Sequence, residues 1–221
     1  MNRPLLFLFI GAVTGAVMFI SLNLGAAILA TVAAESEYPA RPPDARVRFA
    51  GDSISAGWQR AHAQRNAAVS GTTTALIGTR FAQEVQIGSP AYAHILAGTN
   101  DFYSAGKGGP DTQKMLADLE SAIDAARHRQ VPVIVGTVLP MDAARSAAAS
   151  LIPAYNARLI QQFGHRIVIA DYYNAMVLPS GEQDSSLFRD GIHPNDAGYA
   201  VMNQVLDRAV QELLSKRHWA R

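Results

Sequence analysis

From residue 46 onward, short apolar runs alternate with longer stretches in which apolar and polar positions recur with a helical period. The short runs are almost continuously apolar, whereas a strand with one face in water would alternate. Continuously apolar strands are typical of sheets that are buried on both faces, and most of these sheets are parallel. Five strands are predicted, at residues 47–50, 66–70, 91–97, 131–138 and 166–170.

The stretches between these runs place apolar residues three or four positions apart, as do amphipathic helices that cover a sheet. Helices are expected at residues 73–85, 113–129, 145–163 and 196–214. This alternation predicts a three-layer α/β fold with a five-stranded parallel sheet in the flavodoxin-like order 2-1-3-4-5. Ligands of such folds bind beyond the carboxyl ends of the strands, so the loops that follow the strands are candidate sites.

A different pattern occupies the start of the chain, where Arg3 is the single charged side chain before Glu35. Residues 5–34 are almost entirely apolar, and about 20 apolar residues are enough to cross a bilayer. We therefore predict that residues 1–34 are a transmembrane anchor or a long signal peptide. Residues 35–45 contain three prolines and predict an extended linker.

Both interpretations of the leading segment place the remainder, residues 46–221, outside the cytoplasm. That domain is expected in the periplasm or at the cell surface. It is membrane-anchored through residues 5–34 if the segment is kept, and secreted if the segment is cleaved.

The composition narrows the chemistry that this domain can use. The chain has no cysteine, which excludes disulfide bonds, a thiol nucleophile and cysteine-based zinc sites. Its 19 basic and 18 acidic residues give a net charge of +1, without the surplus of cations that nucleic-acid binding requires. The histidines show no spacing typical of metal ligands, so we expect no metal and no other cofactor.

Residues with catalytic potential follow three predicted strands and precede the last predicted helix. Ser53 follows the first strand, Gly71 the second and Asn100 the third. Asp190 and His193 lie three positions apart, where one tight turn brings them together. A serine hydroxyl needs a base such as histidine, and a carboxylate on the other imidazole nitrogen orients that base. The backbone N–H groups of Ser53 and Gly71 and the amide of Asn100 are candidate donors to an oxyanion.

Several of these residues also have a purely structural interpretation. Ser53 could cap a helix, Asp190 could cap the last helix or close a turn, and Asn100 could shape a turn. Asp52 and Asp101 are expected to hold their loops through side-chain-to-backbone hydrogen bonds. The catalytic interpretation is favoured, because every part of a serine acyl-transfer site occurs at these loops.

The segments GDSI, NAAVSGTTT, AGTND and DGIHPN resemble, in order and spacing, the four sequence blocks of the SGNH/GDSL family of hydrolases. The resemblance runs from Gly51 to Asn195 and identifies residues 46–221 as a hydrolase domain. It implies the flavodoxin-like sheet and an esterase, thioesterase, lipase or carbohydrate-deacetylase activity without a metal. The stretch between Ser53 and Gly71 is short, which leaves little room for the family's usual first helix.

Carried over position by position, the resemblance implies three catalytic residues and three oxyanion donors. Ser53 corresponds to the nucleophile, His193 to the base and Asp190 to its acidic partner. Ser53, Gly71 and Asn100 correspond to the oxyanion hole.

The expected function is that of an exported serine hydrolase that cleaves carboxylic esters or thioesters, with a small-molecule or glycan acyl ester as substrate. Phe102, Met141 and Phe188, in the loops after the strands, are expected to contact that substrate. Two alternatives use the same fold. One is a cell-envelope carbohydrate O-acetyltransferase with the same triad, and the other is a glycan-binding domain without catalysis.

Overall fold

The computed structural model describes residues 47–62, 65–85 and 90–217 of the chain. The predicted anchor or signal at residues 1–34 and the linker at residues 35–45 lie outside the described residues, so these boundaries stay predictions. Within the described ranges, no helix is both long enough and apolar enough to cross a membrane.

Within the part of the chain that the structure describes, five parallel strands form the central sheet, in the order β2-β1-β3-β4-β5. This result confirms the predicted α/β class, the parallel pairing and the strand order. β1, β3 and β4 are buried along their whole length, as their continuously apolar sequences predicted. The strands are β1 (Val47–Gly51), β2 (Arg65–Asn66), β3 (Tyr92–Leu96), β4 (Val133–Gly136) and β5 (Val168–Ala170).

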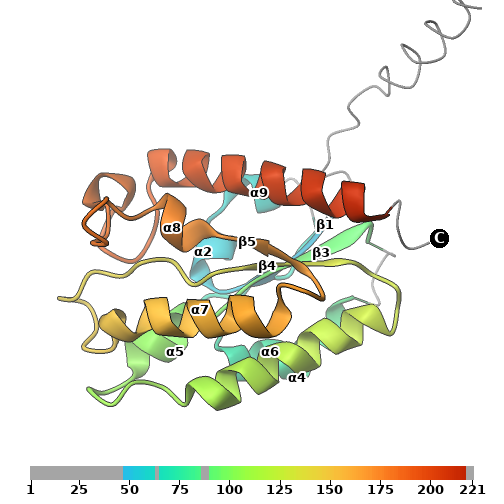
Figure 1. Ribbon diagram of the computed structural model, residues 1–221, viewed down its shortest axis with the longest axis horizontal. Coiled ribbons are helices and arrows are strands. Elements are labelled where there is room, and N and C mark those ends of the chain that lie inside the picture. The colour runs from blue at the N-terminus through green and yellow to red at the C-terminus, as the bar shows by residue number, and fades with distance from the viewer. Residues whose placement is uncertain (1–46, 63–64, 86–89, 218–221) are drawn as a thin grey trace, which may run out of the picture. The chain divides into compact units, whose positions relative to one another are not determined.

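Helices cover both faces of the sheet and make the fold three-layered (Figure 1). The long helix α9 packs on one face, where Met202 and Leu206 join the same apolar cluster as Phe49. α4, α6 and α7 pack on the other face, around Ile95 and Leu119. The helices are α2 (Ser53–Ala56), α3 (Gln59–His62), α4 (Thr74–Glu84), α5 (Thr99–Ser104), α6 (Thr112–Arg127), α7 (Ile152–Phe163), α8 (Tyr172–Ala175) and α9 (Asp196–Arg217).

The helix predicted at residues 145–163 begins later than expected. A 3-10 turn (Ala149–Leu151) precedes α7, which starts at Ile152, and Pro153 occupies its first turn. Proline is favoured in the first turn of a helix and disfavoured further inside, because it has no N–H to donate. The preceding residues form turns instead, and the carboxylate of Asp142 accepts a 2.8 Å hydrogen bond from the Ala144 N–H.

The segment after β3 was expected to be a loop, but it forms the helix α5. Gly98 precedes α5 with a φ of +123°, a conformation that strongly favours glycine. The chain therefore turns directly from the strand into the helix. As a result, Asn100 and Asp101 lie in the first turn of α5, and Phe102 turns into the core.

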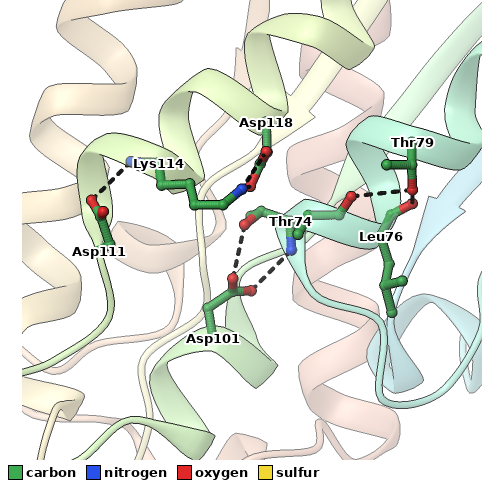
Figure 2. A network of polar contacts seen from close by, with 8 residues as sticks. Thr74, Leu76, Thr79, Asp101, Asp111, Lys114 and Asp118 are labelled. Carbon is green, nitrogen blue, oxygen red and sulfur yellow. Dashed lines mark hydrogen bonds and ion pairs between the residues drawn. The ribbon is translucent and has the colours of Figure 1, made fainter.

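Asp101 connects α5 to the beginning of α4 (Figure 2). Its carboxylate accepts hydrogen bonds from the backbone N–H of Thr74 (3.0 Å) and from the Thr74 hydroxyl (2.8 Å). Thr73, which stands at the N-cap position of α4, makes no capping bond with its own side chain. Asp101 thus caps α4 from a different helix, which confirms its expected structural role and holds the loop before α4 against the end of β3.

Asp52 has the corresponding role at the end of β1. Its side chain is completely buried, and Oδ1 accepts a 2.9 Å hydrogen bond from the N–H of Ile54 at the start of α2. Oδ2 has no hydrogen-bond partner among the described residues. Burial raises the pKa of Asp52 from its usual 3.8 to about 6, and the Ile54 hydrogen bond only partly opposes this rise.

The substitution Asp52→Asn is expected to change stability in a pH-dependent way. Because the pKa rises from 3.8 to about 6 on folding, this carboxyl favours the folded state below pH 3.8 and loses that contribution as pH rises to about 6. The amide keeps the capping oxygen and carries no charge at either pH. The free energy of unfolding of the variant minus that of the wild type should therefore be larger at pH 7 than at pH 4, by on the order of 2 kcal/mol.

Urea unfolding followed by circular dichroism at both pH values measures this difference. Asp111→Asn, the same change at the exposed cap of α6, is the matched control for helix capping. If the free energies of unfolding of the wild type and Asp52→Asn differ by the same amount at pH 4 and at pH 7, Asp52 does not titrate in this range as its burial predicts.

Candidate active site

Ser53 lies at the carboxyl end of β1, as the first residue of α2. The residue that caps this helix is Asp52, so the structure gives Ser53 no capping role. Two positions earlier, residue 51 must be glycine, because a Cβ there would overlap the Ser55 side chain and the Leu96 carbonyl oxygen. The close approach of β1 and β3 therefore positions Ser53 at the edge of the sheet.

Asp190 and His193 share a tight loop just before α9. The loop is closed by a bridge between Phe188 and Pro194 and by a 2.9 Å hydrogen bond from the Arg189 N–H to the His193 carbonyl. Asp190 Oδ1 accepts hydrogen bonds from the backbone N–H groups of Ile192 (3.0 Å) and His193 (2.8 Å). Its second oxygen, Oδ2, lies 2.8 Å from His193 Nδ1. The carboxylate therefore orders the loop and orients the imidazole at the same time.

The surroundings of Asp190 favour its ionised form. Partial burial raises its pKa, but hydrogen bonds from the His193 backbone, the His193 imidazole and the Ile192 backbone lower it more. The resulting pKa of Asp190 lies well below the usual range for a carboxyl group. A carboxylate that stays ionised keeps the proton on Nδ1 of the imidazole, which leaves Nε2 free to accept one.

Ser53 Oγ lies 2.9 Å from His193 Nε2. The structure thus brings together the three predicted catalytic residues, Ser53, His193 and Asp190, in one continuous chain of hydrogen bonds. With the proton on Nδ1, Nε2 accepts from the serine hydroxyl and is placed to take its proton.

The loop with Gly71 is tied to the same edge of the sheet. The N–H of Val69 donates to the Gly51 carbonyl (3.0 Å), and Nδ2 of Asn100 donates to the Thr72 carbonyl (3.0 Å). Gly71 has a φ of +81° and is exposed, and nothing lies within 4 Å of where its Cβ would be. Glycine is therefore needed there for its backbone conformation rather than for space. The Asn100 amide nitrogen carries a second N–H that can donate elsewhere. That this N–H and the backbone N–H of Gly71 donate to an oxyanion stays a prediction.

A cavity of about 540 Å³ opens over the hydrogen-bonded chain of Ser53, His193 and Asp190. Besides those three residues, it is lined by Ala56, Gly57, Ser70 and Arg189. Sequence reasoning did not single out Arg189, although it stands directly before Asp190, because a single exposed arginine has no distinguishing pattern.

The expected substrate contacts are not in this cavity. The proposed contact with Phe102 is wrong, because its side chain is fully buried in the core and packs edge-to-face on Tyr155. Met141 and Phe188 are each only 7% exposed, and neither lines the cavity at Ser53. All three are apolar residues in predicted loops, but their side chains are buried and anchor these segments to the core.

The described ranges contain no cluster of three or more histidine, aspartate or glutamate side chains arranged to hold a metal ion.

Comparisons with known proteins show which protein family has this sequence and fold. The model of the GDSL-like lipase/acylhydrolase family matches residues 49–201. The structure is similar to that of a GDSL-like lipase from Bacteroides thetaiotaomicron, with 27% identity over 83% of this chain and 95% of the other, and a TM-score of 0.67. It is also similar to a proposed acylhydrolase from Bacteroides fragilis, with 28% identity over 80% of this chain and 90% of the other, and a TM-score of 0.68.

A lipase/acylhydrolase from Enterococcus faecalis shares the fold, with a TM-score of 0.60 and 21% identity over 76% of this chain and 96% of the other. No curated protein matches the chain. Because the family model spans most of the domain, including all four sequence blocks, the chain belongs to the GDSL-like lipase/acylhydrolase family and is an ester-bond hydrolase.

Proposed function

We propose that the protein is an exported serine hydrolase that cleaves carboxylic esters or thioesters with Ser53 as nucleophile, His193 as general base and Asp190 as the partner of His193. The observation that carries the proposal is the hydrogen-bonded chain, 2.9 Å from Ser53 Oγ to His193 Nε2 and 2.8 Å from His193 Nδ1 to Asp190 Oδ2. These distances are the ones that proton transfer from a nucleophile to an oriented base requires.

In the first half of the reaction, Ser53 Oγ attacks the acyl carbonyl carbon and its proton passes to His193 Nε2. Asp190 stabilises the imidazolium that forms. The negative charge on the carbonyl oxygen is stabilised by the backbone N–H groups of Ser53 and Gly71 and by the Asn100 amide. When the intermediate collapses, the bond to the alcohol or thiol breaks and the leaving atom takes the proton from His193.

In the second half, a water molecule attacks the acyl-Ser53 ester. His193 accepts a proton from this water, and the collapse of the second intermediate returns a proton to Ser53 Oγ. The carboxylic acid is released and the hydrogen-bonded chain is restored. Nothing besides ester and water is consumed.

The proposed location outside the cytoplasm rests on the sequence pattern of residues 5–34, an apolar segment preceded by Arg3 and followed by Glu35. It concerns where the reaction takes place and is independent of the catalytic assignment.

Ser53→Ala is expected to lower the turnover of p-nitrophenyl acetate by at least about 10³-fold, because the nucleophile is lost. The same variant should lose labelling by a fluorophosphonate probe, which reacts with an activated serine and requires no knowledge of the natural substrate. Ser121→Ala, which removes an exposed hydroxyl on α6, is the matched control and should keep both. Turnover or labelling that survives in Ser53→Ala would exclude Ser53 as the nucleophile.

Asn100→Ala is expected to lower kcat by roughly 10²–10³-fold with a much smaller change in KM, because an oxyanion donor acts mainly in the transition state. Steady-state kinetics on p-nitrophenyl acetate separate the two constants. Asn174→Ala, which removes an exposed amide from α8, is the control. Thermal unfolding of each variant shows whether the loss of the Asn100–Thr72 bond unfolds the site. An effect on KM alone, in a folded variant, would argue against the oxyanion role.

A further inference from the structure

A second, more polar cavity adjoins the one over Ser53. It has a volume of about 490 Å³, and the two cavities share Gly57 and Arg189 as lining residues. Its walls come from α3 and from the beginning of α9, and they include Arg60, Tyr199 and Asn203. No step of the proposed reaction has used this space, although it opens beside the base.

Most polar groups in this wall are already bonded within the protein. Arg60 pairs with Asp207 (2.7 Å) and also donates to the Asn203 carbonyl (3.1 Å). The Tyr199 hydroxyl donates to the Ile54 carbonyl (3.0 Å), and Trp58 Nε1 donates to Asn203 Oδ1 (2.9 Å). These bonds make the wall rigid and leave few groups to bind a ligand.

Arg189 differs from these residues. Its backbone is fixed by the hydrogen bond to the His193 carbonyl and by the adjacent bridge at Phe188, whose side chain is buried. Its own side chain is exposed, and no carboxylate of the described residues lies within ion-pair distance of its guanidinium. The positive charge also lies close enough to Tyr199 to oppose the burial that raises the pKa of the Tyr199 hydroxyl.

Among the described residues, none of the other charges of the cavity forms an ion pair with Arg189. Asp207 pairs with Arg60. The ionised Asp190 has both oxygens bonded within its own loop, to the backbone N–H groups of Ile192 and His193 and to the imidazole of His193. Asp196 also lines the cavity, but it lies in the first turn of α9, where the partial positive charge of the helix N-terminus offsets a carboxylate. In this cavity, the guanidinium of Arg189 therefore binds an anionic ligand group in preference to a neutral one.

The position of the base determines which part of an ester reaches this cavity. His193 must donate its proton to the leaving oxygen or sulfur, so the alcohol or thiol portion lies on the His193 side of the scissile bond. Arg189 and Pro194, on the same loop as His193, line the polar cavity. The leaving portion thus extends from the reacting carbon toward the polar cavity, while the acyl portion extends away from it.

Building on the proposed function, we propose that the polar cavity binds the alcohol or thiol portion of the ester, that this portion bears a carboxylate or phosphate group, and that Arg189 determines this specificity. The guanidinium binds such a group through charge-assisted, bidentate hydrogen bonds. Arg189 acts on substrate selection and takes no part in the proton transfers.

The test compares matched esters with the same acyl group, using the purified full-length protein. The carboxylate pair is 4-acetoxybenzoate and 4-acetoxybenzamide, and the phosphate pair is 1-acetylglycerol 3-phosphate and 1-acetylglycerol. In each pair, the ratio of kcat/KM for the charged ester to that for the neutral one is normalised to the rates of the same esters with hydroxide. We expect a preference of about tenfold or more for the charged member of at least one pair. The pair that shows it identifies the anion as carboxylate or phosphate.

Arg189→Gln should reduce that ratio by about tenfold or more, and Arg189→Lys should retain part of it because the charge remains. Arg129→Gln, the same change at an exposed arginine in the turn after α6, should leave the ratio unchanged. Labelling of Ser53 by the fluorophosphonate probe shows that the site of each variant is folded. A normalised ratio near one for the wild type in both pairs, or a ratio that Arg189→Gln leaves unchanged, would overturn the inference.

In either of those cases, hydrolysis of the neutral esters and labelling of Ser53 would leave the proposed function intact. Failure of the wild type to hydrolyse any of the esters, together with the absence of labelling at Ser53, would overturn the proposed function and this inference with it.

Discussion

A single hydrogen bond, between Ser53 Oγ and His193 Nε2, joins two segments that are separated by 140 positions in the sequence. The rest of the domain serves to hold its two ends in place. At one end, the pairing of β1 with β3 and the buried cap at Asp52 set the position of Ser53. At the other end, the loop before α9 is closed on itself and Asp190 orients the imidazole from within it. The parallel sheet makes this convergence possible, because the carboxyl ends of its strands meet at one edge.

The polar contacts around this bond serve the same purpose in different ways. Asp52 and Asp101 are both carboxylates near the ends of neighbouring strands, and both cap the start of a helix. Asp52 is completely buried, so its charge is costly and its pKa rises, whereas Asp190 is partly exposed and richly hydrogen-bonded, so its pKa falls. Two aspartates of one site thus differ in pKa because their surroundings differ. The first orders the backbone under Ser53, and the second keeps His193 ready to accept a proton.

Much of this arrangement follows from patterns that the sequence displays directly. The continuous apolar runs predicted β1, β3, β4 and β5, and the polar blocks after the strands predicted which loops meet. The second strand was expected at residues 66–70, but β2 is only Arg65–Asn66, and the residues that follow it are half-buried or exposed. The beginning of α7 was not predicted, because the alanine-rich stretch before Pro153 has a helical composition but forms turns around Asp142. Phe102 was assigned to a substrate contact because Gly98 marks a turn without revealing that a helix follows at once. Arg189 was missed because its importance depends on two cavities that only the folded chain forms.

We propose that one hydroxyl, one imidazole and three N–H donors surround the same reacting carbon. A crystal structure of the protein with a phosphonate bound covalently to Ser53 tests this arrangement, because the tetrahedral phosphorus takes the place of that carbon. We expect a phosphonyl oxygen at about 2.7–3.1 Å from the backbone nitrogens of Ser53 and Gly71 and from Nδ2 of Asn100. An adduct at Ser53 whose phosphonyl oxygens all point into solvent, out of reach of these three nitrogens, would contradict it.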